Sequence, residues 1–196
     1  MTNQSPRHPR RIRCSNTEYE LRLMSAADTK AALAFAQALP PHDLLFMQRD
    51  IRNPKVVAAW VEQIERGSIM SLLAYADGAI HGCAAIVRDV LSWSPHVGEV
   101  RIVVGQAARG GGLGRLLAQD AFAFAVSAGI EKLVARMTPD QSGAIAVFEE
   151  MGFRAEALLR DYVRDADGET HDIVILSLDV DRSRAQREAY GYREAF

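Results

Sequence analysis

The stretch that decides the fold reads VRIVVGQAARGGGLGR and runs from Val100 to Arg115. Residues 100–104 are mostly β-branched and apolar, which is typical of a buried strand, and Gly105 ends that run. The sequence Arg109-Gly110-Gly111-Gly112-Leu113-Gly114 follows. From Leu113 onwards apolar residues recur with helical spacing, at Leu116, Leu117, Ala121, Phe124 and Ala125. The stretch therefore predicts a strand, a glycine-rich turn and a helix in direct succession.

A turn of this kind is suited to hold an anion. Glycine permits positive φ and a close approach of the backbone, and the helix start offers unpaired N–H groups at the positive end of its dipole. A Walker A loop is excluded because Arg115-Leu116, and not Lys-Ser/Thr, follows the last glycine. A dinucleotide turn would follow the first strand, whereas about a hundred residues precede this one. On these residues alone, a flexible loop without a ligand remains an equal alternative.

The spacing Arg109-x-x-Gly112-x-Gly114 resembles the acyl-CoA signature of the GNAT superfamily (Gcn5-related N-acetyltransferases), which is Arg/Gln-x-x-Gly-x-Gly/Ala between a strand and a helix. Residues 141–153, QSGAIAVFEEMGF, are similar to the same family's helix that runs from a polar residue to Gly-Phe. The resemblance covers about residues 69–179. It implies an α/β (α+β) fold in which helices flank a mixed, mostly antiparallel central sheet with a splayed central strand.

The resemblance also implies acetyl-CoA as cosubstrate. The exposed backbone of the central strand would pair with the pantetheine arm, and the glycine turn would surround the pyrophosphate with positive charge from Arg109 and Arg115. The site expected for acetyl-CoA consists of Ile102, Val103, Val104, Arg109, Gly110, Gly111, Gly112, Leu113, Gly114, Arg115, Gln141 and Phe148.

Three residues are candidates for proton transfer. Glu99 stands where several family members carry a carboxylate, and His96 lies three residues earlier. Imidazole suits a proton relay near neutral pH. Phe148 occupies the position at which many members have a tyrosine that serves as general acid, and phenylalanine has no proton to give. Tyr162, on a later strand, is a substitute donor, although a tyrosine there is more often a packing residue.

Two functions of different class follow. The first is transfer of an acetyl group from acetyl-CoA to a primary amine by direct attack in a ternary complex; the second, motivated by Phe148, is a non-catalytic acyl-CoA-binding or sensing module. In the resemblance the acceptor wall falls within residues 26–67. An acidic wall would use Asp43, Asp50 and Glu99 and favour cationic amines, whereas an apolar wall would use the side chains of Phe46, Met47 and Trp60.

Length and composition describe an ordinary globular chain. Its 196 residues fit one domain, and a net charge of −2 gives no general basic field for nucleic acid. Cys14 and Cys83 are its only cysteines, which suits a reducing cytosol, so we expect a cytoplasmic protein. The five histidines lie in separate stretches without metal-ligand spacing, so no metal site is predicted. Single-domain members of the family are commonly dimers, so a homodimer is an expectation.

The ends of the chain differ from its middle. Residues 1–18 carry four arginines and two prolines and are expected to be a disordered basic tail; a nucleic-acid-binding arm is the less favoured reading. The acetyltransferase domain is expected over residues 19–179, and residues 180–196 form a charged C-terminal tail. No apolar stretch at the start resembles a signal segment, and no membrane partner is expected.

Hydrophobic periodicity and turn residues place the remaining elements. Strands are expected over residues 19–24, 69–76, 80–90, 99–104, 132–137, 154–164 and 171–178, and helices over residues 26–39, 54–67, 113–129 and 139–152.

Overall fold

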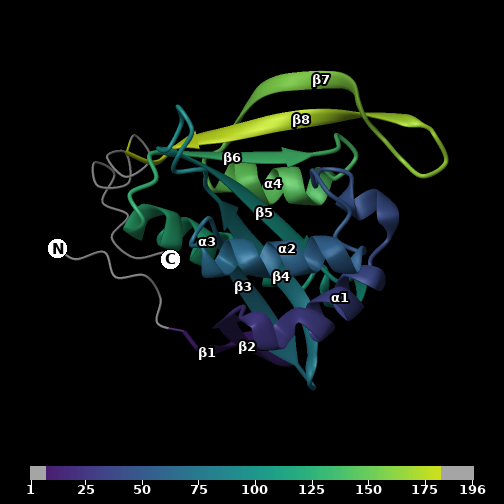
Figure 1. Cartoon of the computed structure of the whole chain (residues 1–196), viewed down its shortest axis with the longest axis vertical. Coiled ribbons are helices and arrows are strands. Elements are labelled where there is room, and N and C mark those ends of the chain that lie inside the picture. The colour runs from purple at the N-terminus through teal and green to yellow at the C-terminus, as the bar shows by residue number, and fades with distance from the viewer. Residues whose placement is uncertain (1–7, 182–196) are drawn as a thin grey trace.

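The computed structural model describes residues 8–181. Eight strands form one sheet in the order β1-β2-β3-β4-β5-β6-β8-β7, with helices on both faces (Figure 1). Only β5 and β6 are parallel neighbours. The strands are β1 (Arg10–Cys14), β2 (Thr17–Leu23), β3 (Ile69–Ala76), β4 (Ala79–Val87), β5 (Val97–Val104), β6 (Lys132–Met137), β7 (Arg154–Arg164) and β8 (Thr170–Asp179). The predicted mixed, mostly antiparallel sheet is confirmed.

The helices are α1 (Thr29–Gln37), α2 (Pro54–Glu65), α3 (Leu113–Ser127) and α4 (Ser142–Glu150), with short 3-10 turns η1 (Ala26–Asp28), η2 (Pro41–Leu44) and η3 (Gln106–Ala108). None of the helices within residues 8–181 is long and apolar enough to cross a membrane. Pro54 begins α2 at the position where a missing N–H is tolerated, and Asn53 caps that helix by accepting a hydrogen bond from Lys55 N–H.

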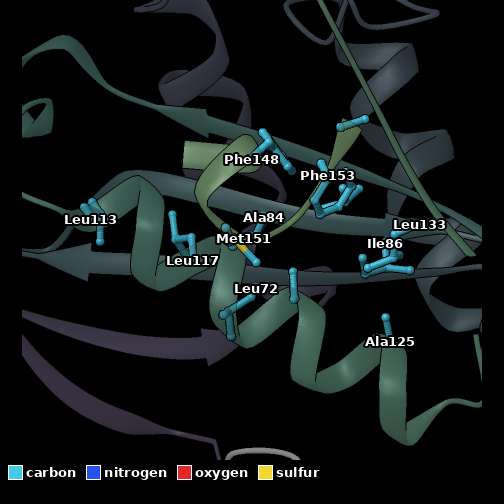
Figure 2. Close-up of a cluster of buried hydrophobic side chains, with 14 of the residues drawn as sticks. Leu72, Ala84, Ile86, Leu113, Leu117, Ala125, Leu133, Phe148, Met151 and Phe153 are labelled. Carbon is cyan, nitrogen blue, oxygen red and sulfur yellow. The ribbon is translucent and has the colours of Figure 1, made fainter. Parts of the chain in front are cut away.

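Each face of the sheet has its own core because strand side chains alternate between faces. Leu72 on β3 packs in a cluster with Leu113 and Leu117 of α3 and with Phe148 of α4 (Figure 2). The next residue, Leu73, packs on the opposite face with side chains of α1 and α2. Helices α3 and α4 therefore cover one face of the sheet, and α1 and α2 cover the other.

A glycine brings α3 close to the sheet. A Cβ atom at Gly82 on β4 would lie 2.9 Å from Leu117 Cδ1, so any side chain there would require Leu117 to shift. The helix thereby starts directly beyond the end of β5, at the Gly-rich turn.

The expectation for the N-terminus is wrong over residues 10–18. Arg10–Cys14 forms edge strand β1, which pairs with β2, and Cys14 is buried in the core. Arg10 also makes two hydrogen bonds to the buried carboxylate of Asp120 on α3, at 2.5 and 3.2 Å. The sequence pattern missed this strand because its arginines are polar and because Arg10 finds its partner only across the fold. Residues 1–7 lie outside the described residues.

Two other boundaries differ from expectation. β4 ends at Val87 and not at residue 90, because its neighbours β3 and β5 pair with it only as far as that residue. In the loop beyond, Leu91 and Trp93 are almost fully exposed. The expected C-terminal tail begins with Val180, which is buried in the core and donates a backbone hydrogen bond to Glu131. Residues 182–196 lie outside the described part.

Candidate active site

The site begins where two neighbouring strands part. β5 and β6 pair only through residues 97–99 and 132–134, whereas β4 accompanies β5 as far as Val104. Gly105 N–H donates to the carbonyl of His81 on β4 at 2.9 Å, so by alternation Val103 also turns its backbone groups toward β4. Ile102 and Val104 turn theirs toward the opened edge. The predicted splay is present, and it offers an unpaired strand edge.

The glycine turn lies at the end of that edge. Gly110 and Gly112 have φ of +74° and +90°, which residues with a side chain rarely adopt, and no atom lies within 4 Å of a Cβ built on either. Gly112 is the N-cap of α3 and its carbonyl accepts the hydrogen bond of Leu116 N–H. The N–H groups of residues 113–115 precede that first bond and are therefore open to an anion.

The opened edge, the glycine turn and α4 enclose a cleft of about 540 Å³. All the residues expected to bind acetyl-CoA line it, with the exception of Gly111. Gly111 instead faces the β1–β2 turn, where a Cβ would lie 3.2 Å from Ser15 Oγ. The cleft fits an elongated ligand with an anionic end, because it joins an open strand edge to a helix start.

Three arginines line the cleft, and two of them are engaged. Arg109 donates from Nε to the carbonyl of Val104 at 3.0 Å and from Nη2 to Asp43 Oδ2 at 2.5 Å. This pair ties the α1–α2 connection to the glycine turn. Arg115 pairs with Glu150 of α4. Arg136, on β6, has a buried Nε with no hydrogen-bond partner in the described structure.

The start and middle of α4 supply Gln141 and Phe148. Gln141 is the N-cap residue of α4, and its side-chain oxygen accepts a hydrogen bond from Thr138 N–H at 3.3 Å. Phe148 is 5% exposed and packs edge-on against Phe153, with ring centroids 4.9 Å apart. Its ring therefore serves the core as well as the cleft wall, and no acid group occupies this place.

The three candidates for proton transfer lie apart. Glu99 and Arg101 form an ion pair at 2.8 Å on the α1–α2 face, and both side chains are largely buried. His96 is exposed before β5, and its carbonyl accepts hydrogen bonds from the residues that begin β6. Tyr162 is 56% exposed on β7. None of the three lines the cleft or the pocket described next, but Glu99 shares its face of β5 with Arg101 and Val103, which line that pocket.

A second pocket of about 150 Å³ opens on the α1–α2 face. Phe35, Met47 and Trp60 form much of its wall, and Trp60 is fixed by a 2.8 Å hydrogen bond from Nε1 to Ser71 Oγ. Val103 lines both this pocket and the larger cleft. The two cavities thus share Val103 of the splayed strand, and the larger cleft passes through the splay, with α3 and α4 on one face and Phe46 and Arg136 on the other.

The residues expected to form the acceptor wall do not all lie in one cavity. Met47 and Trp60 line the small pocket as expected of an apolar wall, whereas Phe46 lines the larger cleft. An acidic wall is not formed, because each of its three carboxylates pairs with an arginine. These pairs are Asp43 with Arg109, Asp50 with Arg52, and Glu99 with Arg101.

A polar cluster that the sequence reading missed lies at the β7–β8 turn. Asp165, Glu169 and His171 bring their ligand atoms within 4.8 Å of one another, and His171 Nε2 lies 2.7 Å from Asp165. His42, which is bonded to Asp140 at 2.7 Å, stacks edge-on against His171 with ring centroids 5.2 Å apart. Carboxylate oxygens and an imidazole nitrogen are common ligands of a cation. In the structure the imidazoles of His42 and His171 already make hydrogen bonds to the carboxylates of Asp140 and Asp165.

Sequence reasoning also missed Arg136, Asp140 and Gly143 as residues of the cleft wall. The available signal was the position of Arg136 in the apolar run that follows Lys132, where a charged side chain needs a partner or a ligand. Asp140 and Gly143 flank Gln141 at a helix start, which is the place where backbone N–H groups gather.

Comparison with solved structures shows the same fold. An N-acetyltransferase from Staphylococcus aureus Mu50 superposes with a TM-score of 0.72 at 19% identity, covering 83% of this chain and 98% of that one. The yncA protein of Salmonella typhimurium, solved with its cofactor acetyl-CoA, gives 0.72 at 20% identity over 83% and 94%. Ribosomal-protein-alanine N-acetyltransferase from Brucella melitensis gives 0.69 at 21% identity over 81% and 98%.

At the level of sequence, no curated protein matches the chain significantly. A model of the acetyltransferase (GNAT) family, however, matches residues 23–153, which is most of the chain. That segment contains the splayed strand, the glycine turn and α4, the elements that form the cleft. The protein therefore belongs to the acetyltransferase (GNAT) family.

Proposed function

We propose that the protein is an N-acetyltransferase that transfers an acetyl group from acetyl-CoA to a primary amine in a ternary complex. One observation carries the proposal: the large cleft and the small pocket both reach Val103 on the splayed strand. Two substrates bound in these cavities would have their reacting ends at the same strand. Direct transfer requires that arrangement, because the amine must reach the acetyl carbon without a covalent enzyme intermediate.

The cleft residues fit acetyl-CoA, which supplies an activated thioester when bound. The N–H groups of residues 113–115 and the guanidinium groups of Arg109 and Arg115 would hold the pyrophosphate. The backbone of Ile102 and Val104 would pair with the pantetheine arm, as an added strand does. Arg109 and Arg115 each have an acidic partner within the described residues, so binding requires them to share or exchange those partners.

The reaction forms a C–N bond and breaks the C–S bond. The amine must be neutral to attack, and it loses one proton as the amide forms. Glu99 is the proposed acceptor of that proton, directly or through one water, because it is the carboxylate of β5 on the face from which the acceptor enters. The sulfur leaves as a thiolate and takes its proton from solvent. A thiol is a fair leaving group near neutral pH, so the absence of an acid at Phe148 is tolerable.

A non-catalytic acyl-CoA-binding module is the second candidate, favoured by the phenylalanine at position 148. The two functions share the cleft and differ in turnover. They are separated by release of free thiol from acetyl-CoA, followed with a thiol-reactive dye, against amino acids, polyamines, peptides and simple amines. Cys14 and Cys83 are buried, and burial raises the pKa of Cys83 to about 12, so the protein itself contributes little background.

Gly143→Trp is the sharpest probe of the cleft. Gly143 lines it, has an ordinary helical backbone, and would place a Cβ in open space, so a large side chain blocks the cleft without backbone strain. Ala146→Trp adds the same group at an exposed position of α4 outside the cleft. We expect the first variant to lose acetyl-CoA binding and thiol release and the second to keep both. Binding without thiol release for every amine would favour the binding module.

Glu99→Gln tests the base. We expect turnover to fall by about 10²-fold or more with acetyl-CoA binding unchanged, since general base catalysis contributes factors of that order. Because a neutral amide at this position no longer balances the charge of Arg101, Arg101→Gln combined with Glu99→Gln serves as the control for that charge. Equal turnover of Glu99→Gln and the wild type would remove Glu99 from the mechanism.

A further inference from the structure

The acidic side chains at and near the two cavities all have partners, whereas two of the arginines that line the cavities take part in no ion pair of the described residues. The carboxylates of Asp43, Asp50 and Glu99 are each neutralised by an arginine. Asp140, the other carboxylate of the cleft wall, is bonded to His42. A cationic acceptor therefore finds no carboxylate that lacks a partner among the described wall residues.

The exposed Arg49 of the small pocket and Arg136 of the cleft are the wall arginines without an ion pair among the described residues, and of the two Arg136 is the one that is partly buried. Its Nε is buried and has no hydrogen-bond partner, and none of the ion pairs of the described residues includes it. A buried N–H without a partner destabilises the folded state by about 1–3 kcal/mol, so such a group marks a place where a ligand completes the hydrogen bonding. The group that completes it is an acceptor of hydrogen bonds, and for a guanidinium the best acceptor is an anion.

The position of Arg136 indicates which substrate it meets. Glu99 on β5 lies beside Val134 on β6, and neighbouring residues of a sheet share a face. Two residues further along β6, Arg136 therefore lies on the same face as Glu99, which is the α1–α2 face where the small pocket opens. Val103, the residue common to both cavities, is on this face of β5 too, and both residues lie beyond the point where the pairing of β5 and β6 ends.

The small pocket supplies an apolar wall on the same face of the sheet, and Arg136 itself lines the larger cleft. The aromatic and aliphatic side chains of the small pocket include Phe35, Met47 and Trp60, and its only charged wall residues are Arg49 and Arg101. An acceptor that satisfies both features carries an anionic group next to its amine and an apolar side chain.

We propose that the acceptor is an α-amino acid with an apolar side chain, whose carboxylate binds Arg136 at the splay between β5 and β6. This inference rests on the proposed N-acetyltransferase function and names its substrate class. The α-carboxylate is bound by the guanidinium, the side chain enters the pocket at Trp60, and the amine is directed to the acetyl group. A peptide N-terminus or a polyamine lacks this carboxylate.

The test compares acceptors that differ only at that group: leucine, leucinamide and 3-methylbutylamine, with spermidine and a Leu-Gly-Gly peptide as alternative classes. Thiol release gives kcat/KM, and calorimetric titration into the CoA-saturated protein gives binding independently of turnover. We expect leucine to exceed leucinamide in both by at least tenfold. In Arg136→Gln that ratio falls to about one, whereas Arg136→Lys restores part of it.

The acid-to-amide ratio is the decisive readout, since a purely structural role of Arg136, or a role toward the acetyl group, would weaken both acceptors equally and overturn the proposal. Arg160→Gln, at an exposed position of β7 outside both cavities, is the matched control and keeps the ratio.

Turnover of spermidine or the peptide in preference to leucine would overturn the proposal and leave the transferase function intact. Selective binding of leucine without thiol release for any amine would support carboxylate binding and refute the transferase function. Absence of leucine binding would overturn the proposal.

Discussion

The ion pair between Arg10 and Asp120 allows a sharp test of whether the N-terminal segment is part of the fold. Asp120 is 4% exposed on α3, and Arg10 reaches it from β1 with two hydrogen bonds. Arg10→Met leaves a buried carboxylate without its main partner, which destabilises a protein by about 3–5 kcal/mol. Because the Arg10 side chain is 34% exposed, water screens part of this effect, and we expect about 3 kcal/mol. For a domain of this size that lowers Tm by about 6–12 °C.

Arg11 provides the matched control one residue away. It pairs with Glu18 at 3.3 Å, and both side chains are mostly exposed, so Arg11→Met is expected to change stability by no more than about 1 kcal/mol. The double variant Arg10→Met/Asp120→Leu removes both charges and is expected to recover most of the loss. Thermal and urea unfolding followed by circular dichroism measure all four proteins. Equal Tm values for Arg10→Met and Arg11→Met would show that β1 is not held on α3 in this way.

Two further predictions concern titratable groups. The pKa of Asp28 is held well below its usual range, chiefly by its hydrogen bonds from Arg22, so its contribution is present above about pH 4 and is lost as the pH falls below the unfolded value. Urea unfolding should therefore show Asp28→Asn to be less stable than wild type by about 2 kcal/mol at pH 7, with a difference about 1 kcal/mol smaller at pH 3; a difference that grows toward acid would refute the assignment. Burial raises the pKa of both Cys14 and Cys83, so a thiol reagent at pH 8 should label neither in the native protein and both in denaturant, and rapid native labelling would contradict their burial.

The sequence allowed the fold and most of the cleft to be predicted because their signals are local. A β-branched run, glycines at fixed spacing and a helical apolar pattern each depend on neighbours in the chain, so the succession of β5, turn and α3 could be predicted. The second motif likewise placed Gln141 and Phe148 on the cleft wall. Gly111 was the exception: it was expected on the cleft wall, but it faces Ser15 in the β1–β2 turn. That contact depends on how β1 and β2 pack, which the local pattern around Gly111 does not show.

What could not be predicted depends on contacts between distant residues. β1 was mistaken for a tail because Arg10 finds Asp120 110 residues away. Asp43 likewise finds Arg109 66 residues away. Asp50 and Glu99 pair instead with arginines two residues further along the chain, and the sequence does not decide whether such neighbours turn toward each other.

The sequence by itself determined the order of elements, the glycine turn and the phenylalanine at position 148, because these are properties of residue type and spacing. Only the tertiary structure decided which charges remain available. An arginine is neutralised only where a carboxylate lies within about 4 Å of its guanidinium group. Arg136 lies beyond the point where the pairing of β5 and β6 ends, and its Nε has no hydrogen-bond partner among the described residues. The glycine-turn side of the cleft is thus largely a matter of local sequence, whereas the α1–α2 side is a matter of packing.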